Sequence, residues 1–301
     1  MPMKRFMKTM LLVVLFSFLF SIPNAFAITE ESDAEVIAVY GEALSPAQLE
    51  ETKKLLKVDE EENVLELTVT AEDIVKYING DPNSNMYSSA KITKLKEGEG
   101  IRIIQITPEN ITQVTNDMYA NALLTAGVTD AKVEVASPIP VTGHSALTGI
   151  FKAYEATGEE LDTARLEVAD EELNVATKLA EEAGISEDQV SQLLAEIKQA
   201  IGEQNPVTRE EVEQIVQEKL DEFGIQISEE YKQLLYELFD KIRALDIDFE
   251  QLQGQLEELA GSIKDKLQEA GVDEGVLQQI GNFFKDLWNA IVDFFKSLFG
   301  N

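Results

Sequence analysis

The sequence of 301 residues contains no cysteine and a single histidine, His144. Disulfide bridges, thiol catalysis, lipid anchoring through an N-terminal cysteine and zinc sites with several histidines are therefore excluded. Basic residues are also scarce, with 25 Lys and Arg against 56 Asp and Glu. The resulting negative field repels nucleic acid and anionic lipid head groups, so we expect no nucleic-acid partner. The acid excess indicates a well-solvated surface, with weak Ca²⁺ association as an alternative and no other cofactor expected.

Long apolar runs are scarce, and the N-terminal one is short. Residues 1–27 combine three basic residues, an apolar run from Met10 to Phe20 and the small-residue pattern Ala25-Phe26-Ala27. This arrangement predicts a secretory signal peptide cleaved after Ala27, because a membrane-spanning helix needs ~20 apolar residues. Loss of those three basic residues would leave 22 Lys and Arg of the 25 against the same 56 acids. We expect a secreted protein without a transmembrane span, extracellular or held non-covalently at the cell wall.

Alternating apolar and polar residues mark the first half of the chain. Strands are expected over Val36 to Tyr40, Val64 to Thr70, Met86 to Leu95, Ile101 to Thr107 and Ala131 to Ala136. Helices are expected from Ser45-Pro46 to Lys57, from Ala71 to Ile78, and from Pro108 or Glu109 to about Ala126, where Gly127 ends the last one. The turn-forming residues Lys96 to Gly100 predict a hairpin between the third and fourth strands. Residues 28–158 are therefore predicted to form an α+β domain with a mixed sheet.

Helical periodicity dominates the second half of the chain. Ser186 with Gln189 and Thr208 with Glu211 form capping boxes ahead of apolar stripes at helical spacing. The pattern predicts an all-α, antiparallel helical array over residues 159–279 and a protein that is predominantly helical overall.

The stretch from Asn110 to Glu155 carries a family resemblance. The residues that carry it are Asn110-Ile111-Thr112, Tyr119 to Leu123, Thr125-Ala126-Gly127, Val135 to Pro138, Val141-Thr142-Gly143 and Ser145 to Gly149. This stretch resembles the YpuA-like family of predicted secreted proteins of Gram-positive bacteria, a family of unknown function. The resemblance implies export and a helical C-terminal half, and it transfers no catalytic residue.

No catalytic, cofactor-binding or metal-binding residue can be assigned from sequence. His144 has no G-x-S-x-G elbow to serve, and its neighbour Ser145 is expected to cap a helix ending near Ala156. Asp81 to Asn85 begins like a calcium loop, but Met86 stands where the loop needs glycine, so a plain turn is predicted. Two carboxylates of a hydrolase stay open as an alternative, because so many acidic residues make pairs unavoidable.

The C-terminal residues 280–301 are predicted to form an amphipathic aromatic helix. At 100° per residue, the candidate contact face comprises Phe283, Phe284, Leu287, Trp288, Ile291, Phe294, Phe295 and Phe299. Its six aromatic side chains would bury roughly 900–1,500 Å², more than a monomer usually exposes in one patch. The rest of the helical domain, a second copy or a membrane surface would cover this face. Packing within the chain is favoured, because the polar face carries no net positive charge to attract lipid.

Together these patterns predict a secreted, non-enzymatic binding or assembly protein of the cell envelope or extracellular space. Its expected partners are a second copy of itself or a cell-envelope component. Two alternatives are a two-carboxylate hydrolase of wall polymers and a membrane-interface protein that uses its C-terminal amphipathic helix.

Overall fold

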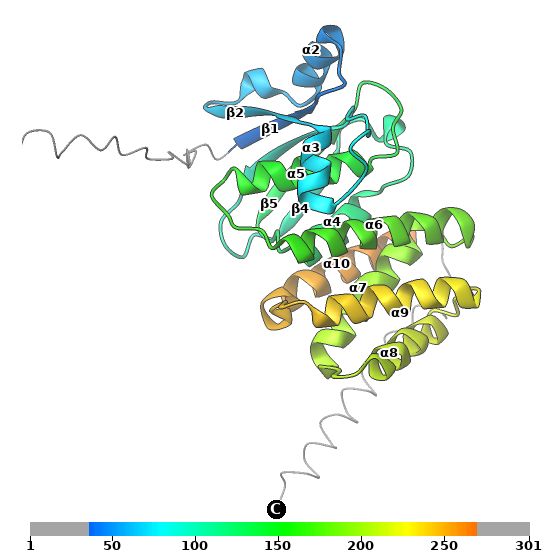
Figure 1. Ribbon diagram of the computed structural model, residues 1–301. Helices are drawn as coiled ribbons and strands as arrows, with labels where there is room; N and C mark the ends of the chain where they lie inside the picture. Colours follow the sequence, from blue (N-terminus) through cyan, green and yellow to red (C-terminus); the bar gives the residue numbers. More distant parts are fainter. Residues whose placement is uncertain (1–35, 270–301) are drawn as a thin grey trace, which may run out of the picture. The chain divides into compact units, whose positions relative to one another are not determined.

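The computed structural model describes residues 36–269, and its first half is built on a five-stranded sheet (Figure 1). The strands are β1 (Val36–Gly41), β2 (Val64–Val69), β3 (Ser89–Lys94), β4 (Ile101–Gln105) and β5 (Ala131–Ala136). They lie in the order β2-β1-β3-β5-β4. The β1–β2 and β4–β5 pairs are parallel, and the β1–β3 and β3–β5 pairs are antiparallel. The predicted α+β fold with a mixed sheet is confirmed.

The predicted hairpin between the third and fourth strands is wrong, because β5 lies between them. The two ends of the loop that follows β3 bond to Asp130, the residue before β5, and not to each other. The Leu95 amide donates to the Asp130 carbonyl at 2.9 Å, and the Gly100 amide donates to the Asp130 carboxylate at 2.9 Å. These contacts keep β3 and β4 apart by the width of one strand, and β5 lies between them.

Helices cover both faces of the sheet. On one face lie α3 (Ala71–Ile78), α4 (Asn116–Ala126) and α5 (His144–Glu155), and on the other α2 (Pro46–Leu55) with the 3-10 turn η1 (Val58–Glu60). Helix α5 crosses β1, β2 and β3 closely, since a Cβ at Gly149 would lie 3.7 Å from the side chains of both Val39 and Val69. The small residue lets the helix approach the strands.

Between residue 159 and residue 269, where the description ends, the chain forms five helices, which confirms the predicted helical half. They are α6 (Thr163–Glu182), α7 (Glu187–Gln204), α8 (Arg209–Glu222), α9 (Glu229–Ala244) and α10 (Phe249–Glu269). Both predicted capping boxes are present, at Ser186 and Thr208. Helix α6 packs against α4 and α3, so one apolar core runs from Ile37 in β1 to Ile242 in α9.

Two helix starts differ from the prediction. Helix α4 begins at Asn116 and not near Pro108, because Ile111 bridges to Val141 and draws the preceding chain into an extended path after the 3-10 turn η2 (Pro108–Asn110). The residue that caps α5 is Gly143, not Ser145, whose hydroxyl donates to Ser88 Oγ at 3.1 Å.

No helix within residues 36–269 is long and apolar enough to cross a membrane. The proposed signal peptide and the aromatic contact face at 280–301 lie outside the described residues. Both stay predictions.

Candidate functional site

A pocket of about 420 Å³ opens where α3, α5 and α6 meet. Its lining residues come from these helices and two neighbouring loops: Ile74, Ile78, Gly80, Asp81, Ser84, Asn85, Val141, Thr142, His144, Ser145, Thr148, Asp170 and Asn174. We call it the α5 pocket. Its volume falls in the range of sites that hold small molecules.

The start of α5 is held at the pocket by a glycine and a tyrosine. Gly143 has φ +108°, and a Cβ there would lie 2.8 Å from both Ile111 Cγ2 and Tyr119 Oη. The buried Tyr119 hydroxyl donates to the Gly143 carbonyl at 2.6 Å. Gly143 has no side chain that could cap α5. The amide groups in the first turn of α5 therefore receive no hydrogen bond from the side chain of the capping residue.

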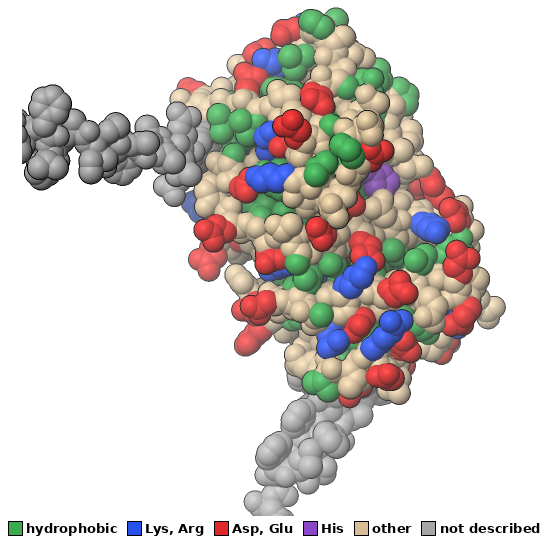
Figure 2. Space-filling view, in the orientation of Figure 1, with side chains coloured by type: hydrophobic (Ala, Val, Ile, Leu, Met, Phe, Trp, Pro, Cys, Tyr) green, Lys and Arg blue, Asp and Glu red, His purple; other side chains and the backbone are tan. Residues whose placement is uncertain are grey.

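His144 is the first residue of α5 and lines the pocket. Its Nε2 lies 3.4 Å from Thr177 Oγ1 of α6. Burial lowers the pKa of the imidazole, and the charge of Glu181 opposes this shift only in part. The ring is therefore neutral at pH 7 and offers one donor and one acceptor. Figure 2 shows it in purple, reaching the surface with acidic side chains nearby.

Two carboxylates in different electrostatic environments line the same pocket. Burial raises the pKa of Asp170 to about 6, with a smaller contribution from the charge of Glu171. Asp170 Oδ2 accepts a bond from Asn174 Nδ2 at 2.9 Å. Asp81 is exposed, and bonds from the Asn83 backbone and side chain to its Oδ1, both 2.9 Å, lower its pKa. The predicted Asp81–Asn85 turn is confirmed by these bonds.

The remaining polar lining is uncharged. Hydroxyl groups of Ser84, Thr142 and Ser145 and the amides of Asn85 and Asn174 line the pocket together with isoleucine and valine, and no Lys or Arg of the described part of the chain is in the lining. Thr148 Oγ1 is buried and has no hydrogen-bond partner among the described residues. The pocket therefore offers many neutral donors and acceptors together with two acids.

Features that looked unrelated in the sequence meet in this pocket. His144, Ser145 and the Asp81–Asn85 loop line it together, although the sequence assigned none of them to a site. Asp170 was missed, because one acid among 56 carries no signal until its burial is known. Within residues 36–269 no cluster of three or more acidic or histidine side chains is arranged to hold a metal ion.

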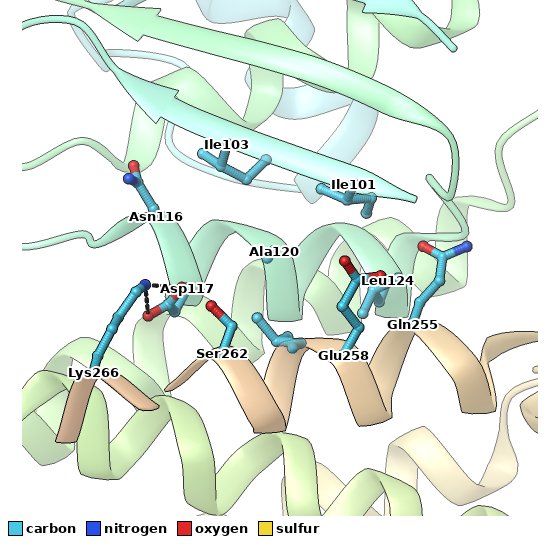
Figure 3. Close-up of a pocket in the computed structure, with 11 residues that line it drawn as sticks. Ile101, Ile103, Asn116, Asp117, Ala120, Leu124, Gln255, Glu258, Ser262 and Lys266 are labelled. Atoms are coloured by element: carbon cyan, nitrogen blue, oxygen red, sulfur yellow. Dashed lines mark hydrogen bonds and ion pairs between the residues drawn. The ribbon is translucent and has the colours of Figure 1, made fainter. Parts of the chain in front are cut away.

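A second depression, of about 210 Å³, lies between β4, α4 and α10. Figure 3 shows its lining: Ile101 and Ile103 on β4; Asn116, Asp117, Ala120 and Leu124 on α4; Gln255, Glu258, Leu259, Ser262 and Lys266 on α10. We call it the α4 trough. At one end Lys266 Nζ contacts both carboxylate oxygens of Asp117, at 2.8 and 2.7 Å.

Comparison with known proteins places most of the chain in one family. The chain is 32% identical over 277 residues, or 90% of its length, to "Uncharacterized protein YpuA" of Bacillus subtilis (strain 168), of which it covers 93%. No solved structure matches it. A family model described as "Protein of unknown function (DUF1002)" matches residues 40–259, which include every residue of the α5 pocket. The chain therefore belongs to this family of unknown function, and the resemblance seen in its sequence is confirmed.

Proposed function

We propose that the protein is an exported, non-enzymatic binding protein whose α5 pocket takes a small hydroxyl-bearing ligand, neutral or cationic. The observation that carries the proposal is the composition of the lining: hydroxyls, amides, a neutral imidazole and two carboxylates, without Lys or Arg. Export is inferred from the pattern of residues 1–27, which is typical of signal peptides.

The charges in the lining decide which ligands fit. An anion would meet Asp81 and Asp170 without a basic residue in the lining to neutralise it, so its binding is disfavoured by desolvation and repulsion. Ligand hydroxyl groups can both donate to the carboxylates and accept from the asparagine amides. An ammonium group is favoured further once Asp170 ionises, above a pKa of about 6.

An amino sugar is the simplest ligand with these properties. Its hydroxyls match the uncharged groups of the pocket, its amine matches the acids, and its C–H face can lie on Ile74, Ile78 and Val141. Exported proteins of a cell envelope meet such sugars in wall polymers, which agrees with the predicted location.

The test uses the NMR signals of the His144 imidazole to report ligand binding, because His144 is the sole histidine in the sequence. We expect glucosamine to shift the imidazole proton resonances most in NMR titrations, glucose less, and glucuronate not at all. Asn174→Ala weakens the response, whereas Gln253→Ala, an exposed amide on α10 outside the pocket, leaves it unchanged. A preference for glucuronate, or no response to any of the three, contradicts the proposal.

A second candidate is a hydrolase of wall polymers, favoured by one specific observation. Two carboxylates whose pKa values are moved apart, Asp170 upward and Asp81 downward, line one pocket. Such a division can equip one group as acid and the other as base. Release of reducing ends from purified peptidoglycan, abolished by Asp170→Asn, would replace binding by hydrolysis as the function.

A further inference from the structure

The α4 trough has the shape of a groove that can bind a helix. Its floor is α4, where Asn116, Ala120 and Leu124 follow one another every four residues, and its walls are β4 and α10 (Figure 3). The trough residues of α10 also repeat at helical spacing, from Gln255 to Lys266. A small floor residue between two walls is the arrangement that receives an amphipathic helix.

The bottom of the trough is apolar, and apolar side chains of its walls are only half-buried. Leu124 is buried in a small cluster with Leu252 and Leu256, and the half-buried Ile101 and Leu259 pack against this cluster from the trough side. Elsewhere in residues 36–269, the exposed large hydrophobic side chains are Val75 on α3, Ile104 on β4 and Val207 in the loop between α7 and α8. These isolated side chains do not form an apolar patch that could cover an aromatic helix.

We propose that the C-terminal segment 280–301 of the same chain docks in the α4 trough with its aromatic face inward. The described part of α10 runs to Glu269, three residues after Lys266 at the rim of the trough. Residues 270–279 would span up to roughly 33 Å when extended, whereas the trough residues of α4 span roughly 12 Å of helix axis. The chain can therefore turn back and run antiparallel to α10.

Connectivity and charge both favour this occupant over a second copy. Consecutive elements of a chain usually lie next to each other, and a short tether keeps the segment near its seat at an effective concentration of about millimolar. A second copy would bring another body of formal net charge −31 against the first, with the repulsion that this entails. The tethered segment carries two Lys and two Asp on its polar face and adds no net charge there.

Trp288 is the only tryptophan of the protein and lies on the proposed inward face, so its fluorescence reports the docking. In purified monomer we expect a blue-shifted emission and weak quenching by acrylamide. Ser262→Arg places a long charged side chain on the exposed trough wall and should release the segment, with quenching rising toward that of the urea-unfolded protein. Gln268→Arg makes the same charge change at an exposed position of α10 outside the trough and should change nothing.

A second variant, Ala120→Phe, fills the floor of the trough and should also expose Trp288 while circular dichroism shows the fold retained. The proposal is overturned if Trp288 in the monomer is as accessible as in urea. It is equally overturned if protection appears only as protein concentration rises, or only with phosphatidylglycerol vesicles, because the occupant is then a second copy or a membrane. Protection that survives both trough variants also overturns it.

Discussion

Lys198 Nζ of α7 lies 2.8 Å from Glu172 Oε1 of α6, and both side chains are sealed from solvent. The same ammonium donates to the Asn121 carbonyl of α4 at 2.8 Å. One ion pair therefore ties the helix beneath the sheet to two helices of the second half. A buried pair of this kind contributes little net stability compared with an apolar pair in its place. Loss of one partner, however, leaves the other charge buried and unpaired.

We predict that Lys198→Met lowers the free energy of unfolding by about 3–5 kcal/mol, because Glu172 is left buried without its cation. The double variant Lys198→Met/Glu172→Leu should recover most of this loss. Urea denaturation followed by circular dichroism measures both. Equal destabilisation in the single and double variants would show that the charges are not coupled.

The half-buried carboxyl of Asp170 predicts a pH-dependent stability. Its pKa in the fold, about 6, lies above its ordinary value, so the fold binds this proton more tightly than the unfolded chain does. The stabilising contribution is therefore present at low pH and is lost as pH rises from about 4 to about 6. Asp170→Asn should be more stable than wild type by about 2–3 kcal/mol at pH 7 and should lose this advantage below pH 4.

The measurement is urea denaturation across this pH range. Asp265→Asn, at an exposed position on α10, serves as the matched control and should follow the wild-type profile. Parallel profiles for Asp170→Asn and wild type would contradict the assignment of the titration to Asp170.

His144 should titrate below its ordinary value of 6.5, because burial disfavours the charged imidazole. Proton NMR gives the midpoint directly, since the sequence contains one histidine. The urea-unfolded protein provides the reference and should titrate near the ordinary value. A midpoint at or above this reference in the folded protein would place His144 in a more acidic or more solvated setting than the structure shows.

Alanine substitutions at two glycines with positive φ distinguish the energetic cost of backbone strain from the cost of steric crowding. Gly184→Ala introduces a side chain at φ +71° with nothing within 4 Å, so it should cost about 1 kcal/mol from strain alone. Gly143→Ala adds overlap with Ile111 and Tyr119, each 2.8 Å from the new Cβ. We expect it to cost at least 1–3 kcal/mol more, a typical penalty for overpacking.

Thermal denaturation of the two glycine variants checks this order. Gly143→Ala should also alter the NMR resonances of His144, because Gly143 sets the start of α5. Equal losses in the two variants would mean that the contact with Tyr119 does not constrain this position.

Local patterns predicted most of the fold. Strand alternation at Val64–Val69 and the capping boxes at Ser186 and Thr208 depend on residues close in sequence, and the structure has them where the pattern places them. The start of α4 was predicted too early, because the bridge between Ile111 and Val141 joins residues far apart in the chain.

The α5 pocket could not be predicted for a related reason. Its polar residues come from three helices and their loops, and their spacing in sequence carries no motif. What distinguishes Asp170 is its place in the pocket lining together with a pKa raised by desolvation, and the role of Gly143 depends on its contact with Tyr119. Both are consequences of the assembled fold.

The order β2-β1-β3-β5-β4 has a consequence for how the chain folds during synthesis and export. The last of the described strands to emerge, Ala131–Ala136, is the one that fills the gap between β3 and β4. Until residue 136 is available, both neighbours have an unpaired edge, and β4 has no partner at all. β4 can therefore join the sheet only once residues 131–136 are available, whereas β1, β2 and β3 can already pair with one another.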